Sequence, residues 1–215
     1  MTDEEDNEVP DGVERDCLDL IYDDGTSINI AGHLVKIAGP QEDQLIGPRD
    51  LDSMIKEDDF AKCYEAALHF LEYRPRSEAE LKQHLLYKRK FLAAAVNRAI
   101  VKLRELQLID DKAFAEAWMR DRIAFKPKSG LMIKRELLLK GVNHEIINEV
   151  TDKIDDETNA YKAGIKKARL LHNLAYAEFY QRLASYLGRR GYNGEVVQMA
   201  VSRLWDTIHY DSSEK

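Results

Sequence analysis

The sequence predicts a mainly α-helical protein, in which three tandem three-helix repeats form an elongated curved array behind a small β-hairpin element. Three passages spaced by about fifty residues support this fold: LKQHLLYKRKFLAAAVNRAIVKL, IKRELLLKGVNHEIINEVTDKI and LASYLGRRGYNGEVVQMAVSRL. In each, an amphipathic stretch runs into a short basic turn, and a second apolar-periodic stretch follows. When Leu86, Leu137 and Leu187 are aligned, three turn residues fall at the same position of the alignment: Lys90, Gly141 and Gly191. Because units of about fifty residues are marginally stable alone, neighbouring units should pack together.

The composition indicates a globular protein with an uneven distribution of charge. Of the 215 residues, 44% are apolar, which is enough to build a core. Residues 1–59 contain 18 acidic and 4 basic side chains (net charge −14), whereas residues 60–215 contain 21 and 28 (net charge +7). A basic body behind an acidic segment indicates a polyanion or an acidic protein surface as partner. A randomly solvated surface behind an acidic, disordered start would explain the same numbers.

The cysteines and the first residues indicate the compartment. Cys17 and Cys63 stand apart, without a CxxC pair or nearby histidines, so we expect reduced thiols and neither a disulfide scaffold nor a zinc site. The N-terminus is acidic where a signal peptide has a basic and then an apolar stretch, and no apolar run approaches membrane-spanning length. We therefore predict a soluble, cytoplasmic protein without a membrane contact.

The part of the chain before the repeats is predicted to hold the β-hairpin. Residues 1–15 contain seven acids and lack apolar periodicity, which predicts a disordered acidic tail. Two runs of β-type residues flank an Asp-Gly turn signal, which predicts a hairpin over about 17–31. Two glycines and two prolines between Gly39 and Asp52 predict a linker. From Asp50 onward the pattern is helical. Residues 16–59 are thus predicted to form a small N-terminal β/α element and linker.

The first repeat is predicted over residues 60–109. Its first helix stops before Pro75, because the residue before a proline disfavours the helical conformation. Ser77 and Glu80 have the spacing of a capping box, which predicts the start of the second helix there. That helix ends in the basic run at residues 88–90, and a further apolar stripe marks the third helix.

The second repeat is predicted over residues 110–154, the third over 155–206, and a polar tail over 207–215. Asp110 can cap the first helix of the second repeat, where a carboxylate also favours the positive helix end. Gly141 can adopt the left-handed conformation that ends the second helix, and the same glycine recurs one unit later. Each repeat is therefore three helices, with a tight turn between the second and the third.

No arrangement of reactive residues predicts an enzyme. The sequence lacks GxSxG, HExxH, P-loop and GxGxxG motifs. Its six histidines are scattered without ligand spacing, and the adjacent carboxylates of Asp110 and Asp111 are explained by a helix start. We therefore assign no catalytic residue, no metal ligand and no cofactor.

Basic residues are the candidates for binding a partner, because they recur at the turn of all three repeats. The helix macrodipole favours a cation at a helix C-terminus by about 0.3–1 kcal/mol, which explains one charge per helix better than two or three. A stacked array would place such charges along one edge, facing an anionic lattice or an acidic groove. The alternative for isolated arginines is an ion pair within their own unit. The candidate partner-binding residues are Arg74, Arg76, Lys88, Arg89, Lys90, Arg120, Arg122, Lys134, Arg135, Lys140, Arg189 and Arg190.

Four ordered stretches span about two-thirds of the chain: AALHFLEYRPRSEAEL, LIDDKAFAEAWMRDR, SGLMIKRELLLKGV and YLGRRGY. In this order and spacing they resemble the RecX family of bacterial recombinase regulators. The resemblance implies an all-helical, non-enzymatic modulator that binds the RecA filament, lies along its groove, and inhibits strand exchange, DNA-dependent ATP hydrolysis and co-protease function. It carries family motif positions onto this chain, among them Ser77, Asp111, Gly130, Gly141 and Gly191.

The first repeat departs from the family pattern. Its YKRKF stretch has Lys90 and one extra residue where the family usually has a glycine, which leaves the geometry of this turn open. The alternative function is direct binding of single- or double-stranded DNA through the helix-turn-helix pairs, with DNA as a weak ligand. Against it, no helix shows a dense row of Arg, Asn and Gln for reading bases. An array with its own polar ends needs no second copy, so we predict a monomer.

Overall fold

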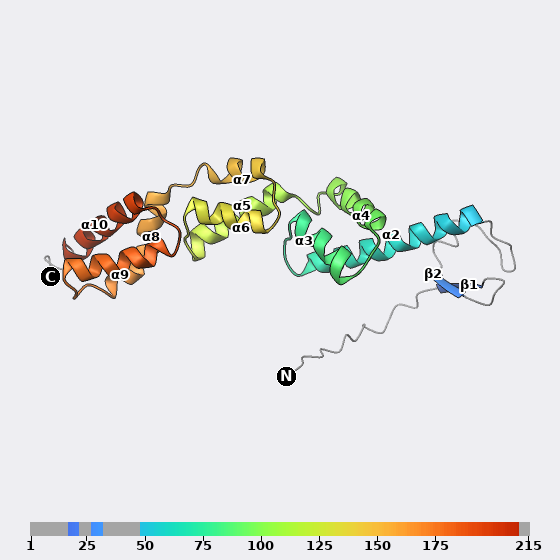
Figure 1. Cartoon of the computed structure of the whole chain (residues 1–215), viewed down its shortest axis with the longest axis horizontal. Coiled ribbons are helices and arrows are strands. Elements are labelled where there is room, and N and C mark those ends of the chain that lie inside the picture. Colours follow the sequence, from blue (N-terminus) through green and yellow to red (C-terminus); the bar gives the residue numbers. More distant parts are fainter. Residues whose placement is uncertain (1–16, 22–26, 32–47, 211–215) are drawn as a thin grey trace, which may run out of the picture.

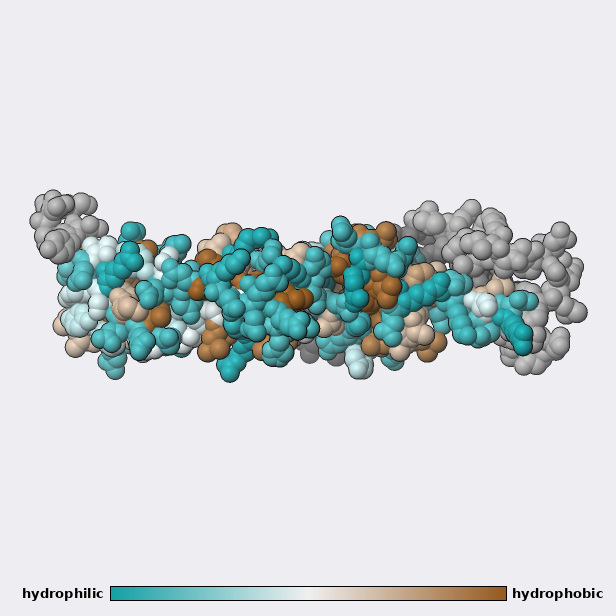
Figure 2. All heavy atoms as spheres, turned by 90° about the horizontal axis from the view of Figure 1, so that it is seen from above, coloured by the Kyte–Doolittle hydropathy of each residue, from teal (hydrophilic) through white to brown (hydrophobic). Residues whose placement is uncertain are grey.

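The computed structural model describes residues 17–21, 27–31 and 48–210. Figure 1 shows three helical units in a row, with the β-hairpin near one end and the C-terminal unit at the other. The predicted elongation is confirmed, whereas curvature of the array stays a prediction. On the face shown in Figure 2, apolar side chains gather over the first and middle units and are sparse over the third.

The predicted hairpin is confirmed. Strands β1 (Cys17–Ile21) and β2 (Ser27–Ala31) pair antiparallel, with Cys17 opposite Ala31 and Ile21 opposite Ser27. The predicted acidic tail and the part of the predicted linker before Pro48 lie outside the described residues.

The first unit consists of α2 (Pro48–Glu72), α3 (Glu78–Gln83) with the π-helical turn η1 (His84–Lys88), and α4 (Ala93–Glu105). Helix α2 begins at Pro48, two residues before the predicted start of helix at Asp50, and runs through the predicted boundary at residue 60. Proline is favoured at a first helical position, where its missing N–H has no partner to lose.

The second unit consists of α5 (Asp111–Phe125), α6 (Gly130–Leu139) and α7 (His144–Thr151), and the third of α8 (Asp156–Arg169), α9 (Tyr176–Gly188) and α10 (Gly194–Tyr210). The predicted caps are present: Asp110 accepts hydrogen bonds from two backbone amides of α5, and Asn143 accepts one from the first turn of α7. Helix α10 extends into the predicted polar tail, so residues 207–210 are helical.

The π-helical turn accommodates the extra residue of the first repeat. The Arg89 amide donates to the carbonyl of His84 at 3.1 Å, and the Phe91 amide donates to that of Leu85 at 3.1 Å. A π turn holds one residue more than an α turn, so the turn residues stay in register. Leu85, rather than Leu86, is fully buried and therefore takes the place of Leu137, which shifts our alignment by one residue.

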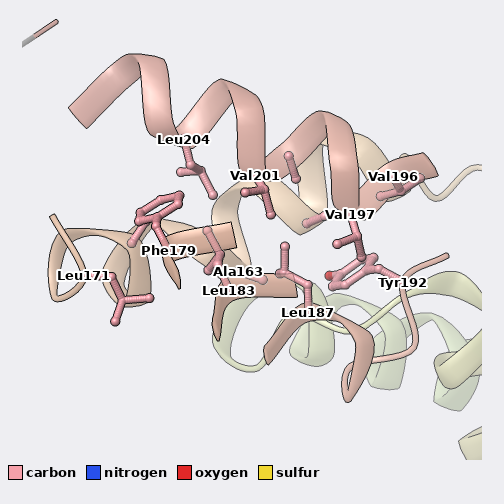
Figure 3. Close-up of a cluster of buried hydrophobic side chains, with 13 residues drawn as sticks. Ala163, Leu171, Phe179, Leu183, Leu187, Tyr192, Val196, Val197, Val201 and Leu204 are labelled. Atoms are coloured by element: carbon pink, nitrogen blue, oxygen red, sulfur yellow. The ribbon is translucent and has the colours of Figure 1, made fainter. Parts of the chain in front are cut away.

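Each unit has its own hydrophobic core. The largest lies in the third unit, where Leu171, Phe179, Leu183 and Leu204 point toward one another between three helices (Figure 3). Gly164 lets α8 and α10 approach, because a Cβ there would lie 2.5 Å from the Cδ1 of Leu204. The first and second units bury separate clusters drawn from their own helices. The units must therefore be joined by something other than a shared core.

Candidate partner-binding surface

The first and second units are joined at the start of α3. The Ser77 hydroxyl, fully buried, donates to the carbonyl oxygen of Lys140 at 2.5 Å. The Glu78 amide donates to the Asp111 carboxylate at 2.8 Å. Burial raises the pKa of Asp111, and the bond from Glu78 partly offsets this. We call this set of contacts the first joint.

The second and third units meet through equivalent positions. The amide of Ser129, again fully buried, donates to the carbonyl of Arg190 at 3.0 Å. The Gly130 amide donates to the Asp156 carboxylate at 2.8 Å. This second joint repeats the first: the start of one unit's second helix meets the basic turn of the next unit and the aspartate that begins its first helix.

The turn glycines are required by these joints as well as by their backbone conformation. Gly141 and Gly191 have φ values of 73° and 87°, and Lys90 takes the same conformation at 59°. A Cβ at Gly141 would overlap the Cβ of Ala79, and one at Gly191 would lie 2.6 Å from the Ser129 hydroxyl. In the described chain the first unit follows a hairpin, not another three-helix unit, so Lys90 can carry a side chain where the other turns need glycine.

Two of the predicted binding residues share the carboxylate of Glu80 at the first joint. Lys140 places its Nζ 2.6 Å from Glu80, and Arg74 contacts the same carboxylate at 2.9 Å. Glu80 also completes the predicted capping box by accepting a hydrogen bond from the Ser77 amide at 3.4 Å. Lys140 therefore helps to join the second unit to the first, whereas Arg74 forms its ion pair within the first unit. The part of both residues in partner binding stays a prediction.

Four more of the predicted residues contact their own unit. Arg190 lies over the ring of Tyr186 at 3.7 Å, and Arg76 over that of Phe70 at 4.0 Å. The other two form ion pairs: Arg122 with Glu136 at 2.6 Å, and Lys134 with Asp152 at 3.2 Å. An ion pair within the same unit is the alternative that we gave above for isolated arginines, and Lys134 shows that it applies to a lysine as well.

Six predicted residues remain open to a partner, and we call them the open basic residues. Five are exposed and form no ion pair with any residue that the structure describes, and the sixth lies 3.9 Å from Glu116 with 69% of its side chain exposed. The open basic residues are Lys88, Arg89, Lys90, Arg120, Arg135 and Arg189. Lys88 and Arg189 are equivalent, since each lies two residues before the turn residue with positive φ.

Sequence reasoning missed a basic stripe on α8. Lys162, Lys166 and Arg169 are all exposed, and their spacing of four and three residues places them on one face of the helix. None of the three forms an ion pair within the described part of the chain. The sequence contains the pattern that predicts this stripe, because the small residues Ala163 and Gly164 mark the opposite, buried face of α8.

A groove at the first joint holds no reactive group. It has a volume of about 410 Å³ and lies at the first joint, where its lining includes Glu78, Arg104, Asp111 and Ile146. Glu78 is paired with Arg104 at 2.5 Å and Asp111 accepts the bond of the first joint. Within residues 17–21, 27–31 and 48–210, no group of His, Cys, Asp and Glu is placed to hold a metal ion. In the same ranges no helix is long and apolar enough to cross a membrane.

The ion pairs of Glu80 predict that acid weakens the first joint. Burial would raise the pKa of Glu80, but hydrogen bonds and charges from Arg74 and Lys140 outweigh it and lower this pKa from 4.5 to about 2. A lowered folded-state pKa contributes stability that is present above the ordinary value and lost as pH falls toward the folded value. We therefore expect the urea midpoint of the wild-type chain to fall between about pH 4.5 and pH 2 more steeply than that of Glu80→Gln. Glu105→Gln, an exposed carboxylate 3.9 Å from Lys102, is the matched control. Parallel acid profiles for all three proteins would contradict the prediction.

Known proteins match this chain along most of its length. Family models for the first, second and third three-helix domains of RecX match residues 63–103, 110–150 and 155–201. A regulatory protein RecX of Clostridium perfringens (strain SM101 / Type A) is 30% identical over 192 residues, which cover 87% of this chain and 89% of the relative.

Two solved structures share the fold. The crystal structure of RecX from Lactobacillus salivarius has a TM-score of 0.61 at 26% identity, covering 69% of this chain and 97% of that one. A crystal structure of regulatory protein RecX has a TM-score of 0.65 at 23% identity, covering 82% and 89%.

Proposed function

This chain belongs to the RecX family of regulatory proteins, and from this premise we propose that it binds the RecA recombinase filament and restrains it. Bound along the filament groove, it would inhibit strand exchange, DNA-dependent ATP hydrolysis and co-protease function, and so regulate DNA repair and the SOS response. Its relatives are named as regulatory proteins, in keeping with a role in binding and not in catalysis.

The observation that carries this proposal is the set of open basic residues. Lys88, Arg89 and Lys90 are adjacent like charges, and none is neutralised by a described carboxylate. Adjacent like charges repel, and the macrodipole at one helix end explains a single cation better than three, so the fold does not account for the whole cluster. A cation at the equivalent place in the third unit, Arg189, supports a surface that extends along the array. An acidic groove or bound DNA in a filament would offset these charges.

The remaining parts of the proposal follow from the same features. A protein with this role acts in the cytoplasm, where the recombinase and its DNA are. A monomer is sufficient, because repetition within one chain already supplies several contact points along a repetitive partner.

Direct DNA binding is the second candidate function, and the α8 stripe favours it. Lys162, Lys166 and Arg169 offer cations along one helix face, as contacts to successive phosphates require. Phosphate contacts give affinity without reading sequence, in keeping with a weak DNA ligand.

The test is DNA-stimulated ATP hydrolysis by a purified RecA filament, measured with increasing amounts of this protein at several salt concentrations. We expect inhibition, and the triple variant Lys88→Glu, Arg89→Glu, Arg189→Glu should need about tenfold more protein, because exposed pairs contribute about 0.2–1 kcal/mol each. Arg190 is left unchanged, since it lies in the second joint. The control reverses three exposed lysines elsewhere: Lys56, Lys102 and Lys153.

Two outcomes would argue against filament binding. The first is a wild-type protein that leaves ATP hydrolysis and filament length unchanged while binding bare duplex tightly, which favours the DNA-binding candidate. The second is an equal loss of inhibition in the control variant, which would reduce the effect to net charge.

A further inference from the structure

Helix α6 carries leucines on its outer face, where no described part of the chain covers them. Leu131, Leu138 and Leu139 are 71%, 41% and 83% exposed. Because a helix turns once in 3.6 residues, these three and Arg135 lie within one face. We call Leu131, Arg135, Leu138 and Leu139 the α6 face. The opposite side of α6 is the one that packs, since Ile133 and Leu137 are fully buried.

The same positions in the third unit show that the fold does not need these leucines. Counted back from Gly191 as the α6 face is from Gly141, the equivalents in α9 are Gln181, Ser185, Gly188 and Arg189. All four are exposed, and none is a large apolar residue. Helix α9 buries Leu183 and Leu187 much as α6 buries its inner residues. Of these two units, only the middle one therefore has leucines on the outer face of its second helix.

The α6 face lies between the open basic residues of the two outer units. Leu139 holds the position that Lys88 has in the first unit and Arg189 in the third. Along the array the equivalent positions thus read basic, apolar, basic. Protein interfaces commonly have an apolar centre in which a few buried side chains supply most of the affinity, surrounded by a charged rim.

We propose that the α6 face is the apolar centre through which this protein docks on the recombinase, at a surface of the partner that has apolar side chains edged by carboxylates. The inference rests on the proposed function and adds to it the part of the surface that is not electrostatic. Arg135 fits such a partner, because it stands among the leucines, exposed and without an ion pair to a described residue.

Two other occupants fit the α6 face less well. A second copy in a two-fold dimer would bring the same patch against itself, which places Arg135 near the other Arg135 and basic rims together. The acidic first sixteen residues, MTDEEDNEVPDGVERD, have the complementary charge but few apolar side chains to cover three leucines. Charge and apolar character together therefore favour a separate protein partner.

The test is a variant in which α6 is given a polar face like that of α9: Leu131→Gln, Leu138→Gln, Leu139→Gln. Glutamine keeps helix propensity close to that of leucine, so circular dichroism and the thermal midpoint should stay near wild type. We expect inhibition of RecA ATP hydrolysis to need at least about tenfold more of this variant, because three leucines buried in the interface would remove a large apolar area from water. Its salt dependence should stay that of wild type, whereas the charge reversals flatten it. The matched control replaces exposed leucines elsewhere: Leu106, Leu108 and Leu170.

Each outcome decides one question. Normal inhibition by the glutamine variant overturns the α6 face and leaves the proposed function standing, whereas a wild-type protein that does not bind the filament overturns both. A wild-type dimer in sedimentation that the glutamine variant abolishes assigns the face to a second copy and overturns the inference. If the triple variant is unstable, Leu139→Cys combined with Cys17→Ser and labelled with an environment-sensitive dye keeps the test valid, since the remaining thiol, Cys63, is fully buried. The dye emission should shift to the blue when RecA filament is added, and an unchanged spectrum counts against the contact.

Discussion

Gly141→Val should loosen the first joint and destabilise the chain more than any other substitution at a turn. The residue has a φ of 73°, a conformation that costs an L-residue about 1–2 kcal/mol. The new side chain would also overlap Ala79 across the joint, and such overpacking costs about 1–3 kcal/mol. We expect a lower urea midpoint and, in small-angle scattering, a broader distribution of distances, because the first unit is then held less firmly to the second.

Two controls separate the backbone effect from the joint. The first control, Lys90→Val, places the same side chain at a φ of 59° in the turn of the first unit. It should lower the free energy of unfolding far less, because Lys90 already has a Cβ in this conformation and neither joint includes this turn. In the second control, Gly141→Ala is combined with Ala79→Gly, which removes the Cβ that the new one would meet. The double variant should be more stable than the sum of the two single changes in the free energy of unfolding predicts. Strict additivity would show that the close approach of these residues contributes nothing.

Phe179→Ala should unfold the third unit while the second remains folded. Phe179 is fully buried in the largest core (Figure 3). Its ring packs edge-on against that of Trp205, with ring centroids 5.0 Å apart. Removing such a side chain costs about 3–5 kcal/mol. Because each unit has its own core, the loss should fall mainly on the third.

The chain contains two tryptophans, which report on different units. Trp118 belongs to the second unit and Trp205 to the third. Urea denaturation of Trp118→Phe and Trp205→Phe backgrounds, with and without Phe179→Ala, should therefore show an early transition only where Trp205 is the reporter. Met199→Ala, at a position 46% exposed, should change stability by about 0.5 kcal/mol or less. If both tryptophans report the same shifted transition, the joints couple the units into one cooperative body.

Local structure could be predicted from the sequence because its causes lie within a few residues. The capping box at Ser77 and the left-handed turn at Gly141 depend on side chains and backbone angles that a short stretch determines. The start of α2 was predicted at Asp50, two residues after Pro48, since the surrounding glycines and prolines resembled a linker. The π-helical turn was missed, although its cause, the extra residue, was visible.

The joints could not be predicted, because each pairs groups far apart in the chain. Ser77 and Lys140 are separated by 63 positions, and nothing in either neighbourhood names the other. The capping role of Glu80 already explained why a glutamate stands at this position. Nothing in the sequence therefore indicated that it also pairs with Lys140. For the same reason the basic turns were expected to be alike, whereas a neighbouring unit covers the second and third turns and leaves the first one open.

Two joints built from equivalent positions make the middle unit exchangeable. If residues 110–154 were deleted, the third unit would follow the first directly, and Asp156 would stand where Asp111 now accepts its bond. Ser77 would then meet the turn at Gly191, which has the conformation of the turn it lost. A shorter chain with a single joint would result, and by the same geometry an added unit would lengthen it. The span of partner that such a protein covers can thus change by whole units in one genetic step, without redesign of what remains.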